Sequence, residues 1–86
     1  MEVFYVHSSA RRLASRILQR MLQLRTSPNR GVKRANFHVL RNNKFPAVLI
    51  ESGFLTHYRE VRLCRSSSYR ARLAKQIARA ILEQRQ

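Results

Sequence analysis

One carboxylate in this sequence lies where α/β proteins commonly bind their ligands. Glu51 directly follows the apolar run of residues 47–50, and Gly53 supplies a turn just after it. The apolar run predicts a strand buried on both faces, and open α/β sheets bind ligands at the carboxyl ends of such strands. A carboxylate beside a buried strand tends to have a raised pKa, as a general acid or base requires. Glu51 is therefore the candidate catalytic residue, with a structural glutamate paired to an arginine as the alternative.

Other reactive residue types are present, but their spacing predicts no site. His7, His38 and His57 lie far apart and lack the spacing of a metal-binding motif, so each is expected to be partly exposed. The single cysteine, Cys64, excludes an internal disulfide and cannot form a cysteine-based zinc site by itself. Ser52 lies in Glu-Ser-Gly-Phe and not in the Gly-x-Ser-x-Gly pattern of serine hydrolases. The residues alone therefore assign no metal ligand.

The chain is strongly basic. Its 86 residues include 18 Lys and Arg against 4 Asp and Glu, which gives a net charge of +14. Such a charge attracts polyanions, which include nucleic acid, anionic lipid and acidic envelope polymers. The segment 29–34 resembles a small anion site but lacks the phosphate-loop pattern, so a solvated turn is the simpler interpretation. A small basic protein that binds nucleic acid or an anionic surface is the alternative hypothesis, although the aromatic residues do not interleave with the arginines as stacking platforms do.

The periodicity of the apolar residues predicts one small domain of the α/β class. Two long amphipathic helices and one short helix are expected to pack with a partial sheet of about three strands. The expected strands cover residues 3–6, 37–40 and 46–50. The expected helices begin near Ser8 or Ser9, Thr56 and Ser66 and end near Arg25, Leu63 and Leu82.

Such a sheet is not complete by itself. The strand at 46–50 needs cover on both faces, and we expect the first long helix to cover one face and the last helix the other. A three-stranded sheet still has two unprotected edges. Residues 1–86 are therefore expected to be a piece of a larger domain.

No segment of the chain predicts membrane insertion or export. No apolar run approaches the roughly 18 residues of a membrane span, and the first residues lack the basic start and apolar stretch of a secretory signal. The chain as written is therefore expected to be cytoplasmic. The sequence indicates no particular oligomeric state.

Three stretches resemble the C-terminal half of the zinc-dependent N-acetylmuramoyl-L-alanine amidases of the amidase type 3 family. They are Asn29–Lys33, Phe37–Arg41 and Pro46–Leu55, the last of which reads Pro-Ala-Val-Leu-Ile-Glu-Ser-Gly-Phe-Leu. The expected strand at 3–6 and the closing helix fit in the same order, so the resemblance covers nearly the whole chain. It implies an α/β fold, a bacterial cell-wall hydrolase and peptidoglycan as the substrate.

The resemblance also implies a mechanism. In the family, zinc held by two histidines and a glutamate polarises the amide between N-acetylmuramic acid and L-alanine and activates a water. A second glutamate, in a Glu-x-Gly-Phe motif, serves as general base or acid. The resemblance implies that Glu51 is this residue.

The chain departs from the family pattern in ways that matter for its activity. The three zinc ligands of the family precede the strand that corresponds to residues 3–6, so none is carried onto His7, His38 or His57. Thr56 follows Gly-Phe-Leu where the family often has Ser-Asn. The resemblance therefore implies the C-terminal portion of a catalytic domain, which keeps a catalytic glutamate, lacks zinc ligands and is inactive alone. The family is exported to the periplasm or cell envelope.

Overall fold

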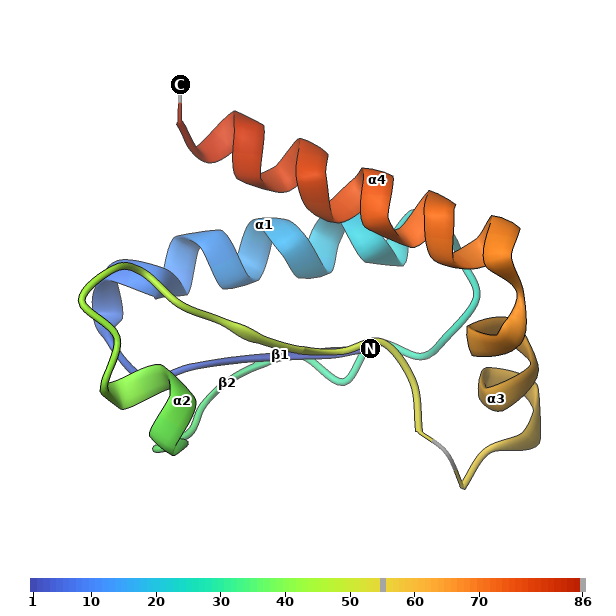
Figure 1. Ribbon diagram of the computed structural model, residues 1–86, viewed down its shortest axis with the longest axis horizontal. Helices are drawn as coiled ribbons and strands as arrows, with labels where there is room; N and C mark the ends of the chain where they lie inside the picture. Colours follow the sequence, from blue (N-terminus) through green and yellow to red (C-terminus); the bar gives the residue numbers. More distant parts are fainter. Residues whose placement is uncertain (55, 86) are drawn as a thin grey trace.

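The computed structural model describes residues 1–54 and 56–85, so Leu55 of the amidase-like string lies outside the described residues. Along the chain the elements are β1 (Glu2–Tyr5), η1 (Ser8–Ala10), α1 (Arg11–Leu22), β2 (Val32–Arg34), α2 (His38–Arg41), β3 (Leu49–Glu51), α3 (Tyr58–Arg65) and α4 (Ser67–Gln84). Figure 1 shows the sheet, α1 and α4 as successive layers.

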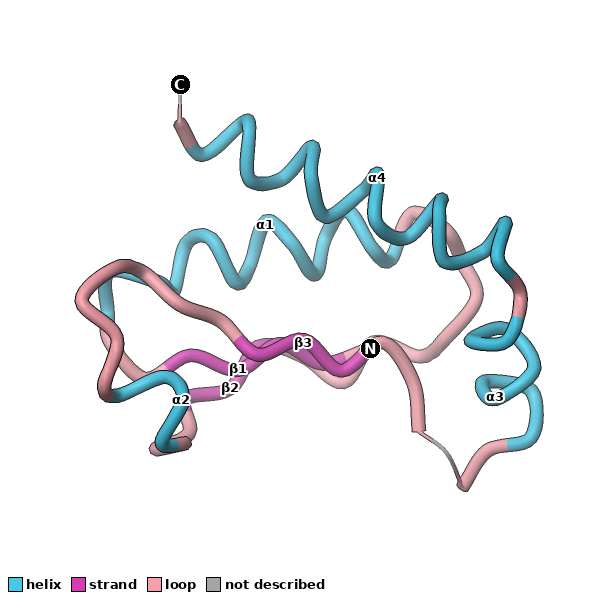
Figure 2. Tube along the Cα trace, viewed as in Figure 1, coloured by secondary structure: helices cyan, strands magenta, loops and turns pink. Residues whose placement is uncertain are grey.

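Three short strands form one mixed sheet in the order β2-β1-β3 (Figure 2). β1 pairs with β2 in parallel, with Val3 opposite Val32, because α1 carries the chain back across the sheet between them. β1 pairs with β3 in the antiparallel sense, with Val3 opposite Ile50. The predicted α/β architecture with three strands is confirmed, and β1 is its central strand.

The core is centred on α1, which packs on one face of the sheet and also contacts α4. Val3 has no exposed surface and packs in one cluster with Met1 and the apolar stripe of α1. The buried residues of α1 are Ala14, Ile17, Leu18 and Met21. The predicted spacing of three and four residues in the first helix is therefore confirmed as the stripe that faces the sheet.

The last helix does not cover the second face of the sheet, so that prediction was wrong. α4 packs against α1, on the side of α1 away from the sheet (Figure 1). Ala80 has no exposed surface and allows a close approach of the two helices, and Glu83 forms ion pairs with Arg16 and Arg20 of α1. Periodicity indicates which side of a helix is buried, but it does not indicate which neighbour buries it.

The predicted strand at 37–40 was also wrong. The second strand is β2, and the chain at 37–40 instead leads into the short helix α2. Hydrophobicity does not predict β2, because within this strand Val32 alone packs against the core, while Lys33 and Arg34 are basic and exposed. Phe37 packs edge-on against Phe4, with ring centroids 5.3 Å apart, and Leu40 is fully buried one turn later. Tertiary packing of these two side chains outweighs the strand preference of the sequence.

Of the predicted helix caps, only Ser66 is confirmed. Its hydroxyl accepts a hydrogen bond from the backbone N–H of Tyr69 at 3.2 Å. Ser8 and Ser9 lie inside the 3₁₀ turn η1, which has no side-chain cap. Thr56 does not cap α3, which begins two residues later.

The predicted boundaries of α1 and β3 also move. α1 ends at Leu22, earlier than expected, because Arg25 adopts a left-handed conformation with φ of 55° that ends the helical turns. β3 begins at Leu49 and not at residue 46, because residues 46–48 make no strand pairing, and it extends through Glu51 itself. Its residues are half-buried and not buried on both faces. The missing cover is the consequence of α4 packing on α1.

Substitutions at Ile17 test this packing. Its side chain is 1% exposed between α1 and the sheet, so Ile17→Val is expected to lower the free energy of unfolding by about 1 kcal/mol and Ile17→Ala by about 3 kcal/mol. Urea unfolding followed by circular dichroism measures both. Val39 is 61% exposed on α2, so Val39→Ala is the matched control and should change stability by less than about 0.5 kcal/mol. Equal losses at the two sites would contradict the assigned core.

Candidate active site

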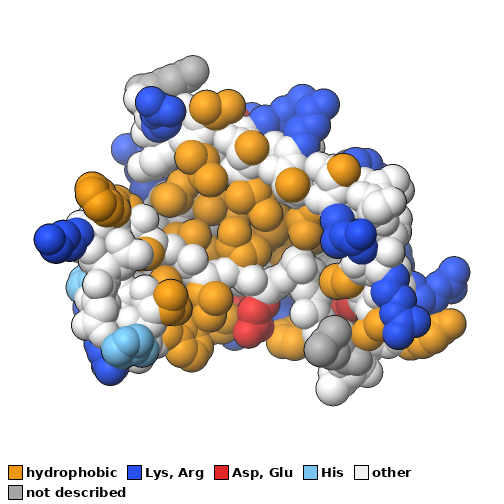
Figure 3. Space-filling view, viewed as in Figure 1, with side chains coloured by type: hydrophobic (Ala, Val, Ile, Leu, Met, Phe, Trp, Pro, Cys, Tyr) orange, Lys and Arg blue, Asp and Glu red, His pale blue; other side chains and the backbone are white. Residues whose placement is uncertain are grey.

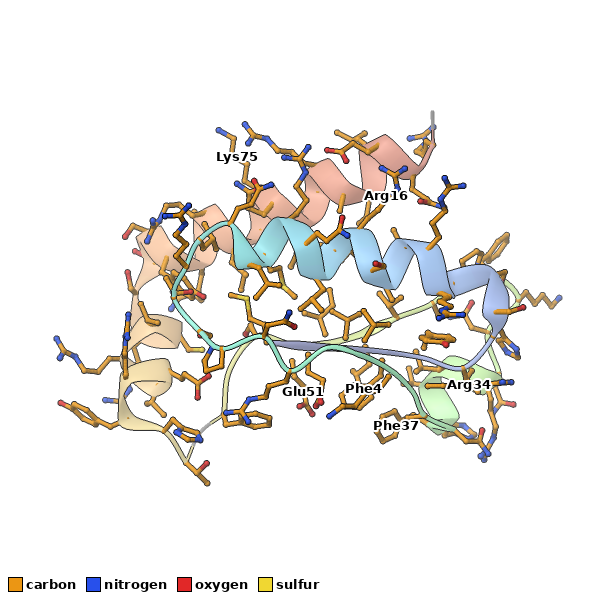
Figure 4. All side chains as sticks on the ribbon, turned by 180° about the vertical axis from the view of Figure 1, so that it is seen from behind. Phe4, Arg16, Arg34, Phe37, Glu51 and Lys75 are labelled. Atoms are coloured by element: carbon orange, nitrogen blue, oxygen red, sulfur yellow. The ribbon has the colours of Figure 1, made fainter. Side chains whose placement is uncertain are left out.

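Glu51 is the last residue of β3 and lies on the sheet face away from α1. Its neighbour Ile50 packs against the core, so alternation along the strand turns Glu51 to the opposite face. Figure 4 shows Glu51 on the same side of the sheet as Phe4 and Phe37, with α1 on the other side. Glu51 is half-buried. The predicted position of Glu51 at a strand end is confirmed.

A second carboxylate lies beside Glu51 on the same face. Glu2 of β1 is directly opposite Glu51 in the antiparallel register, which brings two like charges close together. Glu2 is buried, at 6% exposure, and forms an ion pair with Lys33 of β2. Among the described residues, the carboxylates that form ion pairs are those of Glu2 and Glu83, and Glu51 forms none. Glu51 is therefore not the arginine-paired glutamate of the alternative interpretation.

The turn after Glu51 is held by Glu60 of α3. The Glu60 carboxylate accepts a hydrogen bond from the backbone N–H of Phe54 at 3.3 Å. A Cβ placed on Gly53 would lie 3.1 Å from the Cβ of Glu60, so the small residue permits this close approach. Glu60 is only 5% exposed, and its Oε1 has no hydrogen-bond partner among the described residues. The sequence analysis missed this role, because a lone glutamate in a helix gives no signal of the distant turn it holds.

The segment 29–34 also supports the turn and is not a free solvated loop. The guanidinium of Arg30 lies over the ring of Phe54, 4.2 Å from its centroid, a favourable cation–π geometry. The backbone N–H of Arg30 donates to the carbonyl of Met1 at 2.8 Å, and the Met1 amino group donates to the carbonyl of Pro28 at 2.7 Å. Burial lowers the pKa of that amino group, while the nearby Glu60 carboxylate opposes the shift. β1, the turn after β3 and α3 therefore meet at Arg30 and Glu60.

The three histidines do not converge on Glu51. All three are exposed. The His7 ring pairs with the carbonyl of Arg41 at 3.0 Å, and the His38 ring pairs with the amide of Asn42 at 3.0 Å. His57 lies beside Phe54, with ring centroids 6.2 Å apart. These histidines have local structural contacts and are not arranged as a site.

The described residues do not fit a zinc ion. Residues 1–54 and 56–85 contain no group of three or more His, Cys, Asp or Glu side chains placed to hold a metal. Cys64 is a free, half-buried thiol. No helix among these residues combines the length and apolar character needed to cross a membrane.

Comparison with known proteins places this geometry in a family. The family profile described as N-acetylmuramoyl-L-alanine amidase matches residues 1–83. The chain is 38% identical over 79 residues to an uncharacterized cell wall amidase of Bacillus anthracis, which covers 92% of this chain and 15% of that protein. It is 33% identical over 70 residues to the amidase AmiA of Salmonella typhimurium, and the aligned residues cover 81% of this chain and 24% of AmiA.

Solved structures agree with the sequence relatives. The amidase AmiC2 of Nostoc punctiforme superposes with a TM-score of 0.89 at 36% identity, over 95% of this chain and 46% of AmiC2. The catalytic domain of the amidase CwlV from Bacillus (Paenibacillus) polymyxa gives a TM-score of 0.87 at 30% identity, with the same coverage.

The α/β fold and the family match define a member of a hydrolase family. The chain belongs to the N-acetylmuramoyl-L-alanine amidase family, whose named members here include cell-wall enzymes. It spans less than half of the solved structures and a quarter or less of the two sequence relatives.

The positive charge does not point to another function. Arginines lie exposed on the outer sides of the long helices, as expected for the solvent face of amphipathic helices; they are Arg11, Arg12, Arg70, Arg72 and Arg79. None of the relatives named above is a nucleic-acid-binding protein. The nucleic-acid hypothesis therefore gains no support.

Substitution of Gly53 tests the packing of the turn against Glu60. The methyl group of Gly53→Ala would lie 3.1 Å from the Cβ of Glu60, so we expect a net loss of about 1 kcal/mol in the free energy of unfolding. Gly→Ala usually stabilises a protein, because it lowers the conformational entropy of the unfolded chain. A net loss of stability therefore means that the strain against Glu60 outweighs this effect. Thermal or urea unfolding measures it.

The adjacent Ser52 provides the control. Ser52→Ala adds no atoms and should change stability by less than about 0.5 kcal/mol. A stabilised Gly53→Ala variant would show that Glu60 does not pack closely on the turn.

Proposed function

We propose that residues 1–86 form the C-terminal portion of an amidase catalytic domain and supply its catalytic glutamate, Glu51. The substrate is the amide between N-acetylmuramic acid and L-alanine in peptidoglycan, and the working location is the cell envelope, where peptidoglycan lies. The observation that carries the proposal is a half-buried carboxylate at the end of β3, without a cationic partner among the described residues, in a chain of this family.

The proposed role of Glu51 is proton transfer. A carboxylate that is not held in an ion pair is able to accept a proton from a water that attacks the amide carbon. The C–N bond then breaks, and the same proton passes from Glu51 to the departing nitrogen of L-alanine. The products are a carboxylic acid on the lactyl group and a free amine on the peptide.

The neighbours of Glu51 support this role through position and charge. Lys33 compensates the charge of Glu2, so the second carboxylate is already paired. Glu60 and Arg30 fix the turn that follows Glu51 through Phe54. Glu51 is therefore the carboxylate on this face that remains available for a substrate or a water.

No step of this proposal runs through a metal held by residues 1–86, because the described residues do not provide a ligand cluster. We therefore expect the isolated chain to bind zinc weakly and to lack amidase activity. A single glutamate does not lower the barrier to amide hydrolysis sufficiently.

A chimeric enzyme tests the role of Glu51. In this chimera, residues 1–86 replace the part of AmiC2 that superposes on them. That part is 46% of the AmiC2 chain. The chimera is expected to release peptides that begin with L-alanine from purified peptidoglycan. In this chimera, Glu51→Gln should lower turnover by at least about 100-fold, the lower range of a general acid–base contribution, and should leave the measured metal content of the chimera unchanged.

Two controls accompany the chimera. Glu83→Gln removes a carboxylate that pairs with Arg16 and Arg20, away from β3, and should keep full turnover. The isolated chain should release no peptide. Turnover retained by Glu51→Gln would contradict the assignment, as would peptide release by the isolated chain.

A further inference from the structure

Arg30 is a half-buried cation without an anionic partner in the described part of the chain. Its contact with Phe54 is a stacking contact, with the guanidinium carbon 4.2 Å from the ring centroid. Among residues 1–54 and 56–85, Arg30 forms no ion pair, and its Nε is buried without a hydrogen-bond acceptor. Because a charge removed from water is usually paired or hydrogen-bonded, the unused donors of Arg30 point to an anionic ligand.

The way in which Arg30 is held suits it to a carboxylate. Stacking on an aromatic ring fixes the plane of a guanidinium and leaves the N–H groups at its edge free to donate. Two parallel hydrogen bonds from that edge match the two oxygens of a carboxylate. The backbone N–H of Arg30 also donates to the carbonyl of Met1 at 2.8 Å, so the main chain is fixed as well. Arg30 is therefore preorganised, which lowers the conformational entropy lost on binding.

Arg30 and Glu51 lie at the same end of the sheet. Glu51 is the last residue of β3 and pairs with Glu2, the first residue of β1. β2 runs parallel to β1, and Arg30 precedes β2 by two residues. Arg30 also stacks on Phe54, three residues after Glu51. A substrate whose scissile amide lies at Glu51 therefore has its adjoining groups on the side of the sheet where Arg30 is held.

The other cations of the sheet are already engaged. Lys33 forms an ion pair with Glu2. The Nε of Arg34 donates a hydrogen bond to a backbone carbonyl at 3.0 Å, and Figure 4 shows Arg34 at the opposite end of the sheet from Glu51. Figure 3 shows the remaining blue side chains of that view mainly along the helices and at the outer margins of the molecule. Arg30 is therefore the cation best placed to meet an anion beside Glu51.

The substrate of the proposed function carries carboxylates on one side of the scissile amide. The carboxyl of the lactyl group is consumed in the amide bond, and the N-acetylated sugar is neutral. The peptide that begins with L-alanine ends in a carboxylate. A cation beside Glu51 is therefore complementary in charge to the peptide side of the substrate.

We propose that Arg30 is a specificity-determining residue, which binds a carboxylate of the peptide portion of the substrate through the edge of its guanidinium. This inference rests on the proposed function for the identity of the substrate. The contact holds the L-alanine side of the amide in place next to Glu51. A peptide with carboxamides in place of carboxylates cannot accept these charge-assisted hydrogen bonds, so the enzyme discriminates against it.

Paired substrates test the role of Arg30 in the AmiC2 chimera. The probes are two synthetic muramoyl peptides of the same sequence, one with free carboxylates and one with every carboxylate amidated. We expect the wild-type chimera to have a KM at least about tenfold lower for the free-carboxylate peptide, the lower range for hydrogen bonds to a charged group. Arg30→Gln should bring the ratio of the two KM values to about one, because it removes a contact that only one substrate makes.

Arg72→Gln is the matched control. The guanidinium of Arg72 also lies over an aromatic ring, 5.7 Å from the centroid of Tyr69, but on α4. Its substitution should leave both KM values unchanged. If Arg30 only supported the turn, Arg30→Gln would change both KM values by the same factor and keep the wild-type ratio, which would overturn the proposal.

The wild-type chimera provides a measurement that does not depend on the folding of Arg30→Gln. Equal KM values for the two peptides would overturn the proposal without any variant. Calorimetric titration of the Glu51→Gln chimera separates the inference from the proposed function, since its two Kd values should show the same preference for free carboxylates. That preference, found together with full turnover by the Glu51→Gln chimera, would contradict the proposed function and leave the role of Arg30 standing.

Discussion

The packing of α1 determines the rest of this structure. The stripe that includes Ile17 and Met21 packs on the sheet and joins the buried cluster that Ala80 of α4 also enters, so both the sheet and α4 depend on the same helix. α1 is thus the middle layer, and the sheet has helix cover on one face. This arrangement leaves Glu51 and the free edge of β3 accessible on the described part of the chain.

The turn after β3 shows how a small sheet positions a side chain for chemistry. Glu51 lies at a strand end, where a small change in the following turn would move its carboxylate. Glu60 binds the backbone of Phe54, and Arg30 lies over its ring. These contacts join α3 and the lead-in to β2 to the end of β3, so three distant segments hold one turn.

The sequence predicted the elements whose signal is local and missed those that depend on partners. The α1 stripe, the Ser66 cap and the strand end at Glu51 follow from spacing within a few residues. β2 was missed because its sequence, Val-Lys-Arg, is mostly basic, and its strand conformation comes from pairing with β1. The contact of Glu60 with Gly53 was missed for a similar reason, since it exists only once α3 folds back on the turn.

The central claim is that Glu51 transfers the proton in amide hydrolysis, and chemical rescue tests it most directly. In the AmiC2 chimera, Glu51→Ala removes the carboxylate and leaves space where it was. Added formate should then restore peptide release from peptidoglycan in proportion to its concentration, and it should not stimulate the wild-type or Glu51→Gln chimera. A Glu51→Ala chimera that matches wild-type turnover without formate would contradict the account.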